Sequence, residues 1–163
     1  MPQRYTIAVD NIVTMKEVGV AHIVVGEFTK SADFSDHCRG AGSIAPPDNV
    51  TISEYIRKAF VDELKMAALL SRGEQADKIT LTGTIDHLSF SSIKYLNRGY
   101  WKIGLQVRSS NGKSHHVMES YEFNSGFSAL TACIQTAQAL LPATQNLIGK
   151  LVKSPEFREL VTP

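Results

Sequence analysis

The sequence predicts an α+β fold, a two-layer sandwich in which a mainly antiparallel sheet of about four to five strands carries two long helices on one face. Several short runs place apolar residues at every second position and are separated by turn residues, which is typical of strands in a half-exposed sheet. Two longer runs repeat apolar residues at helical spacing. With 163 residues and 43% hydrophobic residues, the chain has the size and composition of one globular domain, which we assign to residues 1–163.

The first 50 residues predict two strands and a long loop. Residues 5–13 and 19–29 are rich in β-branched and apolar side chains, so we expect two strands, which could form a hairpin. Residues 30–50 break both periodic patterns because they contain Gly40, Gly42 and two adjacent prolines. A loop of this length is uncommon unless it has a function or is tied down.

The first long helix is expected near residues 51–71. Thr51 and Glu54 have the spacing of a capping box, in which the Thr hydroxyl accepts a hydrogen bond from the Glu54 N–H and the Glu carboxylate returns to the Thr51 N–H. The apolar side of this helix should face the sheet. It consists of Ile52, Ile56, Phe60, Leu64 and Ala67.

Three strands are expected next, at residues 78–90, 100–108 and 114–123. Apolar and polar side chains alternate along each of them, so one face of the sheet should be exposed and the other covered by helices. The turns at 97–99 and 110–113 are short, and such turns favour adjacent antiparallel strands in a meander.

The second long helix is expected near residues 127–153, followed by a short helix that begins at Ser154 and Pro155. Pro142 should kink the long helix near Gln138 because it removes a backbone hydrogen bond. We expect one apolar stripe of this helix to face the protein. The stripe is Leu130, Cys133, Ile134, Ala137, Leu140, Leu141, Leu147, Ile148 and Leu151.

Two patterns that could bind a cofactor or metal have a more ordinary structural interpretation. Residues 40–45 match the dinucleotide pattern GxGxxA, but that pattern works only where glycines lead directly from a strand into a helix, and here two prolines follow. His115 and His116 are adjacent on a predicted strand, so they point to opposite faces and cannot chelate one ion together. We therefore expect no cofactor, no metal site and no catalytic residue.

The overall charge argues against some partners. The chain has 17 basic and 16 acidic residues, a near-balance that is unlike the basic stripe of a nucleic-acid or anionic-membrane surface.

The two cysteines leave two interpretations open. Cys38 lies in the long loop and Cys133 on the apolar stripe of the second long helix. They could be separate buried thiols, or they could form a bridge in an oxidising compartment. A catalytic pair of Cys38 and His37 is disfavoured, because a nucleophile and its base usually converge from separate elements.

Aromatic residues gather near the predicted turn at 91–99. Such side chains most often cap the core at the end of a sheet. Alternatively, Tyr95, Arg98 and Tyr100 could form an interaction surface.

Four segments, which lie within residues 5–160, together resemble small proteobacterial envelope lipoproteins of unassigned function. The segments are CRGAGSIAPPDNVTISEYIRKAFVDELKMA, ITLTGTIDHLSFSS, SSNGKSHHVMESYEF and TACIQTAQALLPATQNLIGKLVKSPEFREL. The resemblance implies a protein without catalytic residues that faces the periplasm and is anchored at the outer membrane by a lipid. That lipid would be carried by a cysteine preceding the folded domain, which this sequence lacks together with an export signal. It also implies a disulfide, because Cys38 and Cys133 match the loop and helix cysteines of the family.

We therefore expect a monomeric periplasmic binding or accessory module, which touches the membrane only through its N-terminal lipid and whose partner is an envelope protein or lipid. The alternative is a carrier for a lipid or another hydrophobic ligand. A cytoplasmic enzyme is a distant third, which a start at Met1 without a signal peptide would fit. A carrier predicts an apolar cavity of several hundred Å³ between helices and sheet, whereas an accessory module predicts a filled core and an exposed apolar patch.

Overall fold

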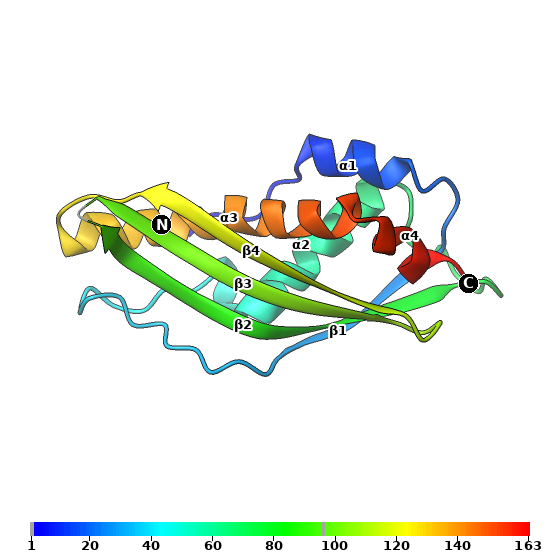
Figure 1. Ribbon diagram of the computed structural model, residues 1–163, viewed down its shortest axis with the longest axis horizontal. Coiled ribbons are helices and arrows are strands. Elements are labelled where there is room, and N and C mark those ends of the chain that lie inside the picture. The colour runs from blue at the N-terminus through cyan, green and yellow to red at the C-terminus, as the bar shows by residue number, and fades with distance from the viewer. Residues whose placement is uncertain (1, 96) are drawn as a thin grey trace.

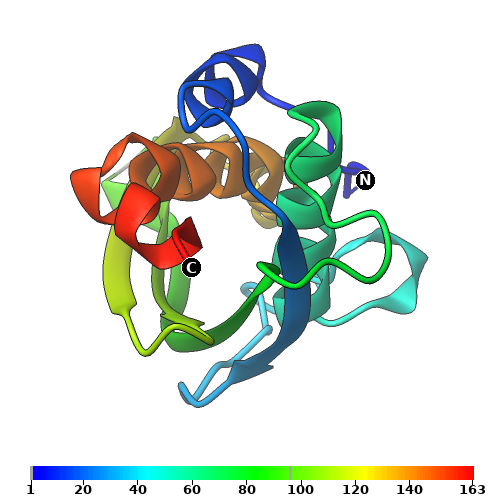
Figure 2. The same cartoon turned by 90° about the vertical axis from the view of Figure 1, so that its right-hand side faces the viewer.

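The expected α+β fold is confirmed by a computed structural model, which describes residues 2–95 and 97–163. The elements in chain order are α1 (Val9–Lys16), β1 (Ile23–Lys30), a 3-10 turn (Pro47–Asn49), α2 (Ile52–Met66), β2 (Ile79–Tyr95), β3 (Arg98–Ser109), β4 (Ser114–Asn124), α3 (Ala129–Lys153) and α4 (Pro155–Val161). The four strands form one sheet in the order β1-β2-β3-β4. Figures 1 and 2 show α2 and α3 together on one face of this curved sheet.

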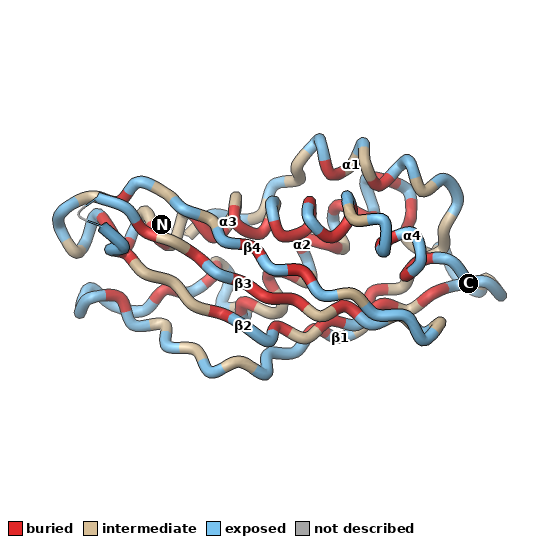
Figure 3. The backbone as a smooth tube through the Cα atoms, viewed as in Figure 1, coloured by how far each residue is buried: buried red, intermediate tan, exposed pale blue. Residues whose placement is uncertain are grey.

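The sheet is mainly antiparallel, as predicted. β2 pairs with β3 and β3 with β4 in antiparallel register, whereas β1 pairs with β2 in parallel, with α2 lying between them in the chain. Ile85, Leu105 and Val117 lie opposite one another across three strands, and all three are buried. Such rows of inward side chains alternate with exposed ones, so buried positions recur along each strand (Figure 3).

The N-terminal strand predicted at residues 5–13 is wrong, because this segment contains helix α1. Asn11 and Met15 are one helical turn apart and are both buried, while Val9 and Val13 face solvent. The helix packs on α2 and α3, so its β-branched residues gain no partner strand and tertiary packing overrides their β propensity. The second predicted strand, at residues 19–29, corresponds to β1.

Helix α2 begins with half of the predicted capping box. The Thr51 hydroxyl accepts a hydrogen bond from the Glu54 N–H at 3.1 Å. The Glu54 carboxylate turns instead toward the Arg57 guanidinium, at 3.4 Å. The helix ends at Met66 rather than near residue 71, and Ala68 just beyond it has a φ of 60°, which no helix continues through.

Helix α3 continues through Pro142 from Ala129 to Lys153, so the proline does not divide it. The predicted burial of its apolar stripe is wrong at the N-terminal end, where Leu130 and Ile134 are exposed. Ala132 and Thr136 are fully buried there instead, which places Leu130 and Ile134 on the opposite side of the helix.

Candidate functional site

The loop between β1 and α2 is held against α3 by a disulfide between Cys38 and Cys133, the pair implied by the resemblance. The two Cα atoms are 6.0 Å apart and both residues are buried. Because its sulfur is bridged, Cys38 is not available as a nucleophile.

Ser92 joins this loop to the end of the β2–β3 hairpin and to the segment before α3. The Arg39 guanidinium donates hydrogen bonds to the Ser92 hydroxyl at 2.7 Å and to the Ser92 carbonyl at 2.9 Å. The same carbonyl accepts a hydrogen bond from the Ser125 hydroxyl at 2.9 Å. Three segments that are distant in sequence are therefore fixed side by side at one end of the molecule.

The glycine-rich segment forms a tight turn within the loop, as expected for a structural element. The Cys38 N–H donates to the Gly42 carbonyl at 2.9 Å, and Gly40 and Gly42 have φ values of 72° and 112°. Such positive φ values favour glycine. The turn leads to further loop rather than into a helix, so it does not place a helix N-terminus against a pyrophosphate.

The aromatic residues near the hairpin end separate into two groups. Trp101 is fully buried and packs against Phe90 and Phe34, with ring centroids 5.1 Å and 6.3 Å away. Tyr95 and Tyr100, which belong to the predicted interaction surface, lie outside the core, and Tyr95 is strongly exposed. Both earlier interpretations thus apply, each to different side chains.

Five large apolar side chains are exposed around the same end of the molecule, and we call them the apolar end. They are Ile93 (51% exposed), Tyr95 (65%), Phe127 (80%), Leu130 (64%) and Ile134 (39%). They come from the end of β2 and from the start of α3, which meet at the left-hand end in Figure 1 and are coloured as exposed in Figure 3. A contiguous apolar surface on a soluble domain usually marks an interaction site.

The charges around the apolar end are unevenly distributed. No Asp, Glu, Lys or Arg occurs between Glu122 and Lys150, so the first part of α3 is uncharged. Arg39, Lys94 and Arg98 are exposed beside the apolar end. Lys94 hydrogen-bonds Glu122, which raises the pKa of Lys94 and lowers that of Glu122, and Arg98 lies 3.8 Å from the same carboxylate.

Sequence reasoning placed Tyr95, Arg98 and Tyr100 at a candidate surface but missed the contribution of α3. Leu130 and Ile134 were assigned to the core because apolar residues at helical spacing are usually buried. The long interval without charges was the available signal, because an ordinary surface helix carries charged residues on its solvent side.

A second cluster surrounds Glu63, a fully buried carboxylate on α2. It accepts hydrogen bonds from the Tyr5 hydroxyl, from the Ala8 N–H at 3.0 Å and from the Asn11 amide at 3.0 Å. Burial raises the pKa of Glu63 and outweighs these donors, which lower it. The Asn11 amide also donates to the Gln145 carbonyl at 2.9 Å, so this cluster ties the N-terminal segment to both long helices.

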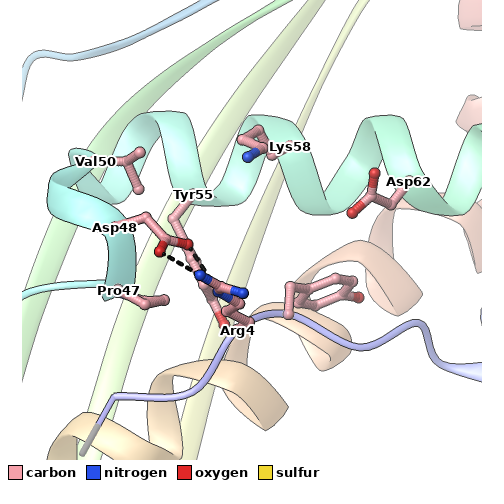
Figure 4. A pocket seen from close by; sticks show the side chains of 8 residues that line it. Arg4, Pro47, Asp48, Val50, Tyr55, Lys58 and Asp62 are labelled. Carbon is pink, nitrogen blue, oxygen red and sulfur yellow. Dashed lines mark hydrogen bonds and ion pairs between the residues drawn. The ribbon is translucent and has the colours of Figure 1, made fainter.

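A small hollow of 190 Å³ lies along the seam between the N-terminal segment and α2 (Figure 4). Arg4 crosses it and pairs with Asp48 at 2.9 Å, while Tyr5 and Tyr55 form its apolar wall. Ligand sites usually measure about 300–1,000 Å³, so we interpret this hollow as a seam between packed segments.

Two larger hollows are open to solvent. The largest, 660 Å³, lies between α1 and α3 and is lined mainly by polar side chains such as Asp10, Asn146 and Lys153. Another, of 360 Å³, lies between the 31–50 loop and the start of α2 and has an apolar lining that includes Phe34 and Ile44.

The histidines are dispersed, as expected. His116 hydrogen-bonds Asp86 at 2.9 Å, whereas His115 lies 4.0 Å from Glu156. Within residues 2–95 and 97–163, no three His, Cys, Asp or Glu side chains are placed to share a metal ion. In the same ranges, none of the helices combines the length and apolar character needed to span a bilayer.

No protein-family model matches the chain, and no curated protein matches it. Among solved structures it is similar to a Xanthomonas campestris protein of the DUF330 family, with 11% sequence identity over 82% of this chain and 84% of that chain and a TM-score of 0.52. A Caulobacter crescentus CB15 protein described as "a putative lipoprotein" has 13% identity over 88% and 90% of the two chains and a TM-score of 0.47. The Xanthomonas structure agrees with the family resemblance in the sequence, and at this identity the likeness is one of fold.

Proposed function

We propose that the protein is a non-catalytic module of the cell envelope that binds another envelope component through its apolar end. The observation that carries this proposal is the exposed, charge-free start of α3 beside the end of the β2–β3 hairpin. Exposing five large apolar side chains is unfavourable in water, so their conservation of position in a rigid frame is best explained by a partner that covers them.

The compartment follows from the disulfide and from the sequence resemblance. Structural disulfides persist in oxidising compartments such as the periplasm. The proposed protein therefore faces the periplasm as a monomer and is held at the outer membrane by a lipid on a preceding cysteine.

A non-catalytic role is supported by the condition of the most reactive groups. Cys38 is bridged, and Glu63 is enclosed by Tyr5, Ala8 and Asn11. A general base must reach the proton it removes, and a fully buried carboxylate saturated with internal donors does not.

A hydrophobic-ligand carrier is the second candidate, and the 360 Å³ apolar hollow beside Phe34 and Ile44 favours it. This hollow lies beside the loop rather than between the helices and the sheet, where the core is filled by one continuous cluster of side chains. A carrier should retain lipid after gentle purification, which native mass spectrometry and solvent extraction would detect.

Site-specific crosslinking tests the main proposal. A photo-reactive phenylalanine analogue placed at Leu130 should crosslink in cells to one defined envelope component, whereas the same group at Val20, which is 86% exposed, should not. Equal labelling at both positions would contradict the proposal, as would lipid retained in the purified protein.

A further inference from the structure

We infer that the apolar end inserts into the surface of an anionic lipid bilayer, so that the envelope component bound there is the membrane itself. This inference rests on the proposed docking role of the apolar end and names its partner.

The side chains of the apolar end suit the boundary between lipid headgroups and acyl chains. Phe127, Leu130 and Ile134 follow one another at helical spacing on the outer side of α3, and they present one aromatic and two branched aliphatic groups. Interfacial helices insert side chains of this kind to a shallow depth and keep polar groups toward water. Tyr95 adds an aromatic ring with a polar hydroxyl, a residue type enriched at membrane interfaces.

The charges beside these side chains complement an anionic surface. Arg39, Lys94 and Arg98 oppose a single acidic group, Glu122, within this end of the molecule. Long basic side chains can lie along an apolar surface and direct their charge to phosphate groups. The near-neutral whole-chain charge suggested no such surface, but a local excess of positive charge is sufficient for contact over a Debye length of about 10 Å.

The shape of this end also favours a bilayer over a protein partner. A partner helix needs a groove, and the hollow beside Leu130 and Ile134 measures only 190 Å³. The disulfide and the hydrogen bonds to Ser92 hold the contributing segments in place, so the apolar side chains project from a fixed frame. In Figure 1 they lie at one extreme of an elongated molecule, where a flat membrane surface can reach them without obstruction.

The test is co-sedimentation of the oxidised chain with vesicles of phosphatidylglycerol and phosphatidylethanolamine. The wild type should bind these vesicles more tightly than vesicles of phosphatidylcholine alone, and added salt should weaken the binding. Replacing two large apolar side chains, in Phe127→Ser/Leu130→Ser, should reduce the partition coefficient by at least about tenfold. The matched control is Val20→Ser/Met66→Ser, which removes two exposed apolar side chains elsewhere and should bind like the wild type.

Insertion can be separated from simple adsorption by Phe127→Trp. After subtraction of the signal from the buried Trp101, its emission should shift to shorter wavelength on addition of anionic vesicles. Absence of wild-type binding to anionic vesicles would overturn the inference, and so would equal loss of binding in the control variant. If Phe127→Ser/Leu130→Ser instead converts a dimer to a monomer in sedimentation velocity, the occupant is a second copy and the inference fails. A protein crosslinked through Leu130 without vesicle binding would refute the inference while leaving the proposed function standing.

Discussion

Loss of the Cys38–Cys133 disulfide should be the most destabilising mild perturbation of this protein. The bridge joins residues separated by 95 positions. For a circuit of that length, the chain-entropy account gives a stabilisation of about 4.7 kcal/mol, which is an upper figure because residual structure in the unfolded chain lowers it. Domains of ordinary stability unfold at a cost of about 5–15 kcal/mol, so the bridge contributes a large share.

Urea unfolding of the oxidised and the reduced protein measures this contribution. With a slope of about 2 kcal/mol per molar urea, reduction should move the midpoint down by roughly 2 M. The Cys38→Ser/Cys133→Ser variant should behave like the reduced wild type, and adding reductant to it should change nothing further.

The order of unfolding gives a second measurement. Residues 31–50 keep other attachments, such as the Arg39 bonds to Ser92 and the buried Ile44, but these are weaker than a covalent bond. Hydrogen exchange should therefore accelerate first at the Cys38 and Ile44 amides, which are hydrogen-bonded within the loop, and later in β2 and β3. An unchanged urea midpoint after complete reduction would refute the reasoning.

Three further substitutions test separate parts of the structure. Gly99→Ala should destabilise the protein by about 1–3 kcal/mol in thermal or urea unfolding, because the new Cβ would lie 2.6 Å from the Ser91 carbonyl oxygen, a backbone atom that cannot turn away. Burial raises the pKa of Glu63 above its ordinary value of 4.5, so the folded state holds this proton more tightly and stability should fall as the pH rises from 4.5 through the raised pKa. Glu63→Gln should flatten that part of the pH–stability curve, and an unchanged slope would contradict this assignment. Arg4→Ala should leave the melting temperature unchanged, because the Arg4–Asp48 pair is exposed to solvent and screened.

Local pattern was sufficient where the burial of an element depends on its own periodicity. The alternation in residues 78–123 and the apolar spacing in 51–71 identified β2, β3, β4 and α2, because each pattern records which side of the element meets the core. The paired prolines and glycines likewise predicted the irregular course of residues 30–50.

Pattern was insufficient where a distant residue decides. Residues 5–13 contain short β-branched runs that suit a strand, and only the buried acceptor on Glu63 explains why Asn11 and its helix pack there instead. Leu130 and Ile134 have the same spacing as buried residues, yet the helix meets the protein through the small residues Ala132 and Thr136. No sequence rule states which side of an uncharged helix will be covered.

The irregular parts of the chain are fixed by polar contacts and a covalent bond, while the regular layers are held by the apolar core. Glu63 gathers the N-terminal segment, and Ser92 gathers the loop, the hairpin end and the start of α3. The side chains of the apolar end belong to neither set, since they are exposed and lie outside the core cluster. Because polar substitution there removes no core contact and no buried hydrogen bond, it should change binding without changing stability, and a loss of vesicle binding in those variants can be assigned to the surface itself.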